Sequence, residues 1–387
     1  MIRGAKGRAL AAPILILGSM ACGARILPEA SLANRAERVL AEMAARVGVE
    51  AALESLRLSQ PTRAQVQGPQ GSADAMPDGT LLGRLQLGTV GTTAFDVIAY
   101  ASSGLVVAGL ICYPDDGQVH SAVVHVHGGM GGLFDGSDPG ILQACFDWAN
   151  LYQRTAFLPS LRGQDGGEGQ LELCLGEADD VAAGTVMLRA LEMTEPERVA
   201  LVGGSMGACV ALRASAQIPG LSAVVAYAPP LDWKGFVDFH RNGWAPATET
   251  ACDGSNMLWN VGGPSYADTI DDIICGHPLC ADADYDARSP LPGVPVQTAP
   301  TVIAAAGSDN IVPAGQQVLW SALRQNLGHP VQTYVIAKCD PFGTPPPAMD
   351  ILLYVPDGYH DLSPNVVSTG LLFLMQELDR PNLSVLP

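Results

Sequence analysis

Basic residues are scarce in this chain of 387 residues, which has 21 Lys and Arg against 39 Asp and Glu and a formal net charge of -18. Such an acidic balance disfavours nucleic acid and anionic membrane surfaces as partners. Charged residues make up only 16% of the chain, whereas hydrophobic residues make up 48%. The composition therefore allows a sizeable buried core, in one large α/β domain or in two domains.

Long hydrophobic runs are also rare, and none predicts a transmembrane helix. Residues 1–21 instead have the order of features of an export signal, in which three basic residues precede the apolar run Ala9–Leu17 and small residues follow it. Cys22 comes next, as in the bacterial lipoprotein box, so simple secretion and a lipid on Cys22 are both open. We expect an exported protein that is secreted, periplasmic or lipid-anchored at the envelope of a bacterium, with that lipid as its one membrane contact.

Nine cysteines in an exported chain predict disulfide bonds. Cys252, Cys275, Cys280 and Cys339 lie in segments rich in Gly, Pro and Asp and are the best candidates, and a Cys275–Cys280 bond would close a small loop. Cys209 follows a Gly-rich turn, inside a predicted helix, and is expected to be a buried free thiol. The spacing of the cysteines is not that of a zinc site.

The chain divides into a predicted N-terminal extension and a main domain. Residues 22–80 are expected to form helices over 31–58 and a linker over 59–79, and to pack on the rest. Residues 81–387 alternate strands with helices, which predicts an α/β fold with a mostly parallel, doubly wound sheet. The expected strands are 81–90, 94–101 and 105–113 (antiparallel hairpins), then 121–126, 155–158, 199–202, 221–226, 301–305 and 331–337, and the expected helices are 178–193, 208–216, 315–326 and 365–378.

Residues 229–298 form a long, weakly periodic stretch rich in Pro, Gly and Asp. We predict that it is an insert after the sixth strand that acts as a lid above the carboxyl ends of the strands, where such sheets bind ligands. Its aromatic residues Trp233, Phe236, Trp244 and Trp259 are candidates for substrate binding. Ordinary core packing explains them equally well.

The segment 202–207 (VGGSMG) is the most informative motif. It follows a short apolar strand and precedes a helix, which is the setting of a G-x-S-x-G nucleophile elbow. A serine hydroxyl becomes a good nucleophile when a tight turn presents it beside a base, so Ser205 is the candidate nucleophile. The alternative is a turn of small residues in which Ser205 caps the helix.

An acid and a histidine follow Ser205 in the order that this motif requires. Asp309 comes after the predicted strand 301–305 and is the candidate acid, with Asp232 as the substitute and a helix cap as the alternative role. His360, in a loop before the last helix, is the candidate base, because His329 lies in a turn between a helix and a strand. His360 would take the serine proton while Asp309 fixes its tautomer.

Two backbone N–H groups are expected to form an oxyanion hole. One belongs to Met206, at the positive end of the elbow helix, and the other to Gly129, in the loop that begins His127-Gly128. His125 and His127 alternate on one strand face and could also hold a metal ion. We favour the oxyanion role for this loop and expect neither a metal ion nor a cofactor.

These motifs together resemble the α/β-hydrolase fold, specifically the catalytic domain of prolyl-oligopeptidase-like and dienelactone-hydrolase-like enzymes. The matching pieces are His127-Gly-Gly, the glycine-rich loop 162–169, residues 177–180 at a helix start, the elbow, Asp309-x-x-Val-Pro313 and His360. The resemblance implies that Ser205 is the nucleophile, Asp309 the acid and His360 the base. A β-propeller is not seen before the domain, Ser replaces the Cys of dienelactone hydrolases, and residues 338–350 form an insertion between the last strand candidates.

We therefore expect a serine hydrolase, most simply a carboxylesterase that forms an acyl-enzyme on Ser205. A prolyl-oligopeptidase-like peptidase (an aminopeptidase or acylpeptide hydrolase) is the alternative, and it would need an acidic anchor such as Asp232, Asp238 or Glu249. A non-catalytic binding protein and a metal-dependent hydrolase are the remaining hypotheses. The expected partner is a small-molecule ester or a short peptide. The oligomeric state stays open, since a shared scaffold does not fix function.

Overall fold

The computed structural model describes residues 32–53, 76–134, 140–276, 280–340, 343, 345–360, 362 and 364–380, with the side chains of the first helix described to residue 48. The predicted export signal, Cys22 and most of the predicted linker lie outside these residues. Residues Ser31–Pro387 belong to one compact unit. Within the described residues, no helix combines the length and the apolar character needed to cross a membrane.

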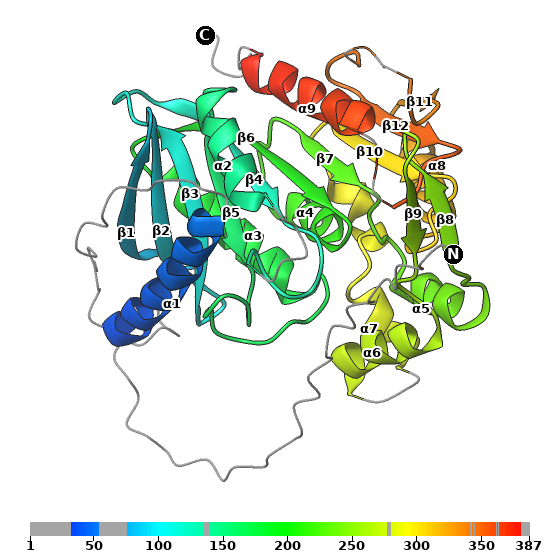
Figure 1. The fold of residues 1–387 in the computed structure, drawn as a ribbon, viewed down its shortest axis with the longest axis horizontal. Coiled ribbons are helices and arrows are strands. Elements are labelled where there is room, and N and C mark those ends of the chain that lie inside the picture. The colour runs from blue at the N-terminus through cyan, green and yellow to red at the C-terminus, as the bar shows by residue number, and fades with distance from the viewer. Residues whose placement is uncertain are drawn as a thin grey trace, which may run out of the picture. The chain divides into compact units, whose positions relative to one another are not determined.

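A ten-stranded sheet in the order β1-β2-β3-β5-β4-β6-β7-β10-β12-β11 forms the centre of this unit (Figure 1). The pairs β1–β2, β2–β3 and β3–β5 are antiparallel, and the others are parallel. The predicted α/β fold with a mostly parallel sheet is thereby confirmed. The strands are β1 (Leu81–Val90), β2 (Thr93–Ser102), β3 (Leu105–Pro114), β4 (His120–Val126), β5 (Thr155–Ser160), β6 (Thr194–Gly204), β7 (Val224–Tyr227), β10 (Thr301–Ala306), β11 (Val331–Val335) and β12 (Asp350–Val355).

Helices cover both faces of the sheet, each over its own apolar layer. On one face lie α1 (Leu32–Leu53), α2 (Ile141–Asn150) and α9 (Pro364–Asp379), and on the other α3 (Gly176–Arg189), α4 (Met206–Ser215) and α8 (Gly315–Asn326). The sequence did not predict α2, because this ten-residue helix begins after Gly140 without a side-chain cap. The helix is nevertheless buried against the sheet through Leu142, Cys145 and Trp148.

The insert follows β7, which is the seventh strand of the chain rather than the sixth. It is more regular than its composition indicates. Its elements are α5 (Trp233–Asn242), the antiparallel pair β8 (Ala247–Thr250) and β9 (Asn256–Trp259), α6 (Pro264–Cys275), α7 (Asp282–Asp286) and the 3-10 helix η2 (Leu291–Val296). Much of it is helical, and the helix α5 has one strongly apolar side that packs into the core.

Four disulfide bonds join eight of the cysteines. The pairs are Cys112–Cys145, Cys174–Cys209, Cys252–Cys339 and Cys275–Cys280. The predicted small loop closed by Cys275 and Cys280 is confirmed. The prediction that Cys209 is a free thiol was wrong, because a turn with positive φ at Cys174 brings that residue against α4.

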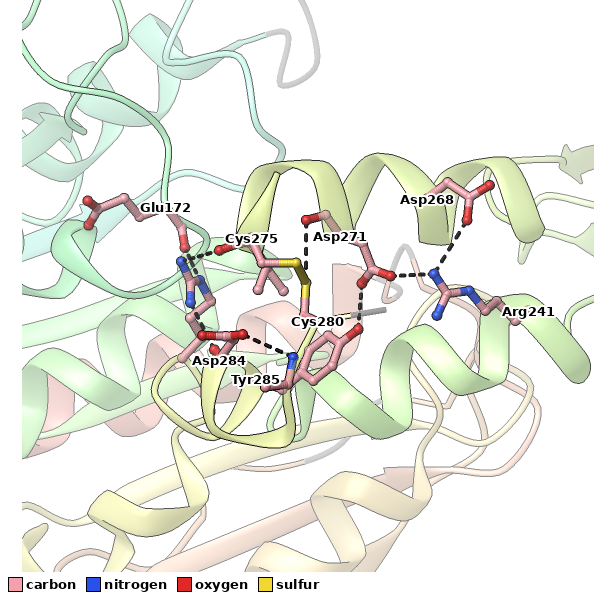
Figure 2. The surroundings of a disulfide bond; sticks show 11 residues. Glu172, Arg241, Asp268, Asp271, Cys275, Cys280, Asp284 and Tyr285 are labelled. Carbon is pink, nitrogen blue, oxygen red and sulfur yellow. Dashed lines mark hydrogen bonds and ion pairs between the residues drawn. A yellow bond between two sulfur atoms is a disulfide. The ribbon is translucent and has the colours of Figure 1, made fainter. Parts of the chain in front are cut away.

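Figure 2 shows how the Cys275–Cys280 bond links α6 to the segment before α7. Beside it, the buried carboxylate of Asp271 accepts hydrogen bonds from the Tyr285 hydroxyl, at 2.6 Å, and from the Arg241 guanidinium. Arg241 belongs to α5, so these contacts fasten α5, α6 and α7 to one another. The helical part of the insert is therefore held by polar contacts and a disulfide.

Candidate active site

The strand β6 turns into α4 at the predicted nucleophile elbow. Ser205 has φ 52° and ψ -123°, a strained conformation at the turn. A Cβ atom on Gly203 would collide with the Gly207 carbonyl, and a Cβ atom on Gly207 would collide with the carbonyls of Val126 and His127. These two glycines therefore allow the close approach of strand, helix and neighbouring loop that exposes the Ser205 hydroxyl.

The structure brings Ser205, Asp309 and His360 together in a hydrogen-bonded chain. His360 Nε2 lies 2.9 Å from Ser205 Oγ, and His360 Nδ1 lies 2.9 Å from Asp309 Oδ2. When Nδ1–H donates to the carboxylate, Nε2 is left to accept the serine proton. The residues come from the carboxyl ends of β6, β10 and β12, which lie near one another in the parallel part of the sheet.

Asp309 faces His360 and does not cap a helix, since α8 begins only at Gly315 and has no side-chain cap. Its Oδ1 accepts hydrogen bonds from the N–H groups of Ile311, at 2.8 Å, and Val312, at 2.9 Å, while its Oδ2 faces His360. The substitute acid, Asp232, accepts from the Gly235 N–H and caps α5 instead. The other histidine, His329, precedes β11 and so lies at the opposite end of the parallel strands from His360.

The loop after β4 lies beside the elbow, as an oxyanion loop requires. Gly128 and Gly129 line the same cavity as Ser205, and an added Cβ atom on Gly128 would lie 3.6 Å from Ser205 Cβ. Met206 is the first residue of α4, so its N–H has no acceptor within the helix. Met206 directly follows Ser205 and Gly129 lines the same cavity, so binding of an oxyanion by these two N–H groups stays a prediction.

Gln164 holds this loop, and the sequence analysis gave it no role. His127 Nδ1 lies 2.9 Å from the Gly128 carbonyl oxygen and His127 Nε2 lies 3.0 Å from Gln164 Oε1. Gln164 Nε2 donates to the Met130 carbonyl at 3.3 Å. Because His127 and Gln164 are both buried, they fix the path of the loop. In the sequence, the glycine-rich loop 162–169 indicates this region, but its pattern does not assign a role to Gln164.

An ion pair anchors the segment that carries Gln164. The guanidinium of Arg162 donates to both carboxylate oxygens of Asp180, with Nε–Oδ2 at 3.0 Å and Nη2–Oδ1 at 2.9 Å. The Asp180 carboxylate also accepts from the Ser102 hydroxyl at 2.6 Å. A two-pronged pair of this kind fixes geometry as well as charge. It therefore explains why Arg162 and the acidic start of α3 occur together in the sequence.

Tyr266 of α6 reaches the site without having been a candidate, and Trp259 is the one predicted aromatic residue of the insert that reaches it. Its ring centroid lies 6.5 Å from that of His360, and the two ring planes are nearly perpendicular, at 82°. The indole N–H donates to Glu249 Oε2 at 2.8 Å, and Lys338 Nζ lies 3.2 Å from Glu249 Oε1. Sequence reasoning did not give Glu249 and Lys338 this supporting role, because their partnership exists only in the folded chain.

The other three aromatic candidates are placed elsewhere. Trp233 and Phe236 are each 2% exposed and pack within the core, where the apolar side of α5 directs them. Trp244 packs against Gly262. None of these three residues lines the cavity beside Ser205, and the alternative of core packing holds for Trp233 and Phe236.

A cavity of about 880 Å³ opens beside Ser205 and His360. It is bordered by the ends of β4, β6 and β7, by α2 and α9, and by the insert. Trp148 and Tyr152 line it from α2, and Val367 and Leu371 line it from α9. Its volume is within the range of pockets that enclose small organic ligands.

The histidines considered as a metal pair have protein partners. The two ring nitrogens of His127 face the Gly128 carbonyl and Gln164, and His125 Nδ1 accepts from Trp148 Nε1 at 3.4 Å. In the part of the chain that the structure describes, no group of three or more His, Cys, Asp or Glu side chains could hold a metal ion. The loop is thus arranged around its own hydrogen bonds.

The fold, the elbow and the hydrogen-bonded triad define the class of the protein. A family model described as the alpha/beta hydrolase family matches residues 123–363. The chain belongs to the α/β-hydrolase family, and the resemblance stated from the motifs is confirmed. The matched range contains Ser205, Asp309 and His360. No curated protein matches the chain.

Solved structures share this fold at low sequence identity. An acetyl xylan esterase from a Paenibacillus species has a TM-score of 0.53 at 15% identity, over 87% of this chain and 94% of that chain. Acetyl xylan esterase 1 from a Thermoanaerobacterium species has a TM-score of 0.51 at 13% identity, over 89% and 93%. An acylaminoacyl peptidase from Pyrococcus horikoshii has a TM-score of 0.50 at 15% identity, over 77% of this chain and 44% of that chain. These likenesses support the fold, and both esterases and peptidases are among them.

Proposed function

We propose that the protein is an exported serine hydrolase that cleaves carboxylic esters through an acyl-enzyme on Ser205. The observation that carries this proposal is the hydrogen-bonded chain from Asp309 through His360 to Ser205. A serine oxygen with an adjacent base, itself oriented by a carboxylate, is the arrangement that nucleophilic acyl transfer needs. No step of the proposed reaction uses a cofactor.

In the first half of the proposed reaction, Ser205 Oγ attacks the carbonyl carbon of the ester while its proton passes to His360 Nε2. The N–H groups of Gly129 and Met206 donate hydrogen bonds to the oxyanion that forms. As the bond to the alcohol breaks, His360 gives its proton to the leaving oxygen. In the second half, a water molecule attacks the acyl-enzyme with His360 as base, which releases the acid and restores Ser205.

The proposal favours an ester over a peptide because a suitable amine anchor is lacking among the predicted candidates. Asp232 caps α5, and Glu249 holds Trp259 and Lys338. Asp238 is not among the described residues that line the cavity. Asp147, on α2, is the one carboxylate of that described lining, and it accepts a hydrogen bond from Gln143 at 2.7 Å.

Export is supported by the four disulfide bonds, since disulfides persist mainly in oxidising compartments. We propose that residues 1–21 are removed and that Cys22 is either lipidated or the first residue of a secreted protein. Intact-mass measurement of the mature protein distinguishes the two. Added diacylglyceryl mass on Cys22 supports the lipid anchor, and a bare N-terminus supports secretion.

The experiment that tests catalysis is labelling of the mature protein with a fluorophosphonate probe, beside Ser205→Ala. Labelling of the wild type alone is expected. A panel of p-nitrophenyl esters and aminoacyl p-nitroanilides then compares esterase with peptidase activity, and Asp147→Asn is included as a variant of the one carboxylate in the described cavity lining.

Ester turnover that disappears in Ser205→Ala and persists in Asp147→Asn supports the proposal. Folded wild type that neither labels nor turns over any ester contradicts it and favours a binding protein. Anilide hydrolysis that exceeds ester hydrolysis and depends on Asp147 would instead identify a peptidase.

A further inference from the structure

We infer that the part of the cavity between α2 and α9 is an acyl pocket that selects esters of bulky, neutral, apolar carboxylic acids. This inference rests on the proposed function, because it needs Ser205 to form the acyl-enzyme. It adds the class of acid that the enzyme transfers. The whole cavity measures about 880 Å³, which is room for the alcohol together with an acyl group larger than acetyl.

The positions of Ser205 and His360 decide on which side the acyl group lies. His360 must protonate the leaving alcohol, so the alcohol lies toward His360 and Trp259. In the sheet, Ser205 follows β6, while Asp309 and His360 follow β10 and β12 to one side. The strands β5 and β3, over which α2 packs, lie to the other side. The acyl group therefore points toward α2.

Most side chains that line this region are apolar, and Asp147 and His125 are the polar exceptions. Trp148 and Tyr152 line it from α2, with Ala144 beside them, and Val367 and Leu371 line it from α9. Val202, near the end of β6, also lines the cavity. Burial of an acyl chain against such side chains removes apolar surface from water, so each added methylene increases binding.

The charges of the lining exclude anionic acyl groups. No Lys or Arg is present among the described residues that line the cavity, and Asp147 contributes a carboxylate. An acid with a second carboxylate would find repulsion and no counterion there. The acyl group of the substrate is therefore expected to carry no charge.

The α2 wall is held firmly in place. The Cys112–Cys145 disulfide fixes α2 to β3, and Cys145 is the neighbour of Ala144 in the chain. Trp148 donates to His125 and packs against Tyr152, with ring centroids 5.3 Å apart. The pocket is thus largely formed before a substrate enters, as is usual for sites that select by shape.

The test compares acyl groups on a constant leaving group. Active sites are counted with the fluorophosphonate probe, and kcat/KM is measured for p-nitrophenyl acetate, butyrate, hexanoate and benzoate. We expect kcat/KM for hexanoate or benzoate to exceed that for acetate by at least about tenfold. A matched series of p-nitrophenyl monosuccinate and butyrate tests charge, and we expect the succinate to be the poorer substrate by at least about tenfold.

Ala144→Phe fills the pocket, and Leu319→Phe, at an exposed position of α8 on the other face of the sheet, is its control. We expect Ala144→Phe to lower kcat/KM for hexanoate by about tenfold or more and to leave acetate within about twofold. Leu319→Phe should leave both unchanged. If Ala144→Phe does not fold, the comparison of acyl groups in the wild type still tests the inference.

Three results overturn the inference. If turnover depends on Ser205 and kcat/KM for acetate equals or exceeds that for hexanoate and benzoate, the acyl pocket is contradicted and the proposed function is not. An equal loss on acetate and hexanoate in folded Ala144→Phe has the same consequence. Absence of any Ser205-dependent turnover removes both the proposed function and the inference that rests on it.

Discussion

The indole N–H of Trp259 donates a 2.8 Å hydrogen bond to the carboxylate of Glu249, and the same indole ring lies edge-to-face against His360. Glu249 is 7% exposed and its second oxygen lies 3.2 Å from Lys338 Nζ. A buried carboxylate thus sets the orientation of a ring that contacts the candidate general base. The hairpin β8–β9 therefore supports the site, although it lies outside the main sheet.

Replacement of Glu249 by Ala should lower kcat on p-nitrophenyl esters by roughly tenfold, equivalent to about 1.4 kcal/mol of transition-state stabilisation. The physical reason is that Trp259 loses its acceptor and no longer restrains His360. Glu249→Gln keeps an oxygen for the indole N–H and should retain most of the activity. Equal kcat values for wild type and Glu249→Ala, measured on sites counted with the probe, would contradict this coupling.

The disulfide Cys252–Cys339 fastens the same hairpin to the segment that leads to His360. Lys338 N–H donates to Asp357 at 3.1 Å, and the Tyr359 hydroxyl donates to the Thr248 carbonyl at 3.2 Å. The double variant Cys252→Ser/Cys339→Ser should lose roughly three- to tenfold in kcat/KM at 25 °C, since the base becomes less well positioned.

Cys275→Ser/Cys280→Ser is the matched control for this prediction. It also removes one disulfide, but between α6 and the segment before α7, away from the hairpin. Activity should stay close to wild type, although both double variants lower the melting temperature. An equal loss of kcat/KM in the two variants would mean that disulfides act here through general stability alone.

Asp309→Asn tests the assignment of the acid against Asp232. The amide still offers one oxygen to the N–H groups of Ile311 and Val312, but it no longer holds the catalytic tautomer of His360. Loss of this orientation should lower kcat by up to about ten-thousandfold while the fold is kept. Asp232→Asn should alter thermal stability slightly and leave kcat unchanged; the reverse pattern, measured by steady-state kinetics, would reassign the acid.

The sequence was most informative where one local pattern carries a function. The elbow could be predicted because its strand, glycines, serine and helix are contiguous. Asp309 and His360 could be predicted because Asp309 comes shortly after the strand β10 and His360 shortly before the helix α9. The alternation of strands and helices predicted the sheet for the same reason. Each of these patterns is a local requirement of the backbone or of the reaction.

What could not be predicted depends on contacts between distant segments. Gln164, Glu249 and Lys338 have partners that lie far away in the chain, and nothing in their local sequence names those partners. Cys209 pairs with Cys174 because the turn at Cys174 meets the helix α4 in space. The helix α2, which lines the cavity, lacks the side-chain cap that marks a helix start. Pocket composition was therefore the least predictable part of the site.

Glu177 gives the protein a pH-dependent stability. It is fully buried in the first turn of α3, where one oxygen accepts from the Glu172 N–H and the other has no hydrogen-bond partner among the described residues. Burial is the main cause that raises its pKa from 4.5 to about 7; backbone N–H groups, including that of Glu172, lower the pKa, and the smaller effects of Asp180 and Arg162 oppose each other. The folded protein therefore keeps a proton that the unfolded chain has already released between pH 4.5 and 7.

Because the folded state binds this proton more tightly, the contribution of Glu177 to stability is complete below about pH 4.5, falls as the pH rises, and is lost above about pH 7. Glu177→Gln keeps an oxygen acceptor and cannot ionise. The variant should therefore gain melting temperature relative to wild type at pH 8, by a few degrees, and show little gain at pH 4.5. The measurement is thermal unfolding of both proteins by circular dichroism from pH 4.5 to 8. A difference in melting temperature that does not change with pH would show that Glu177 titrates alike in the folded and unfolded states.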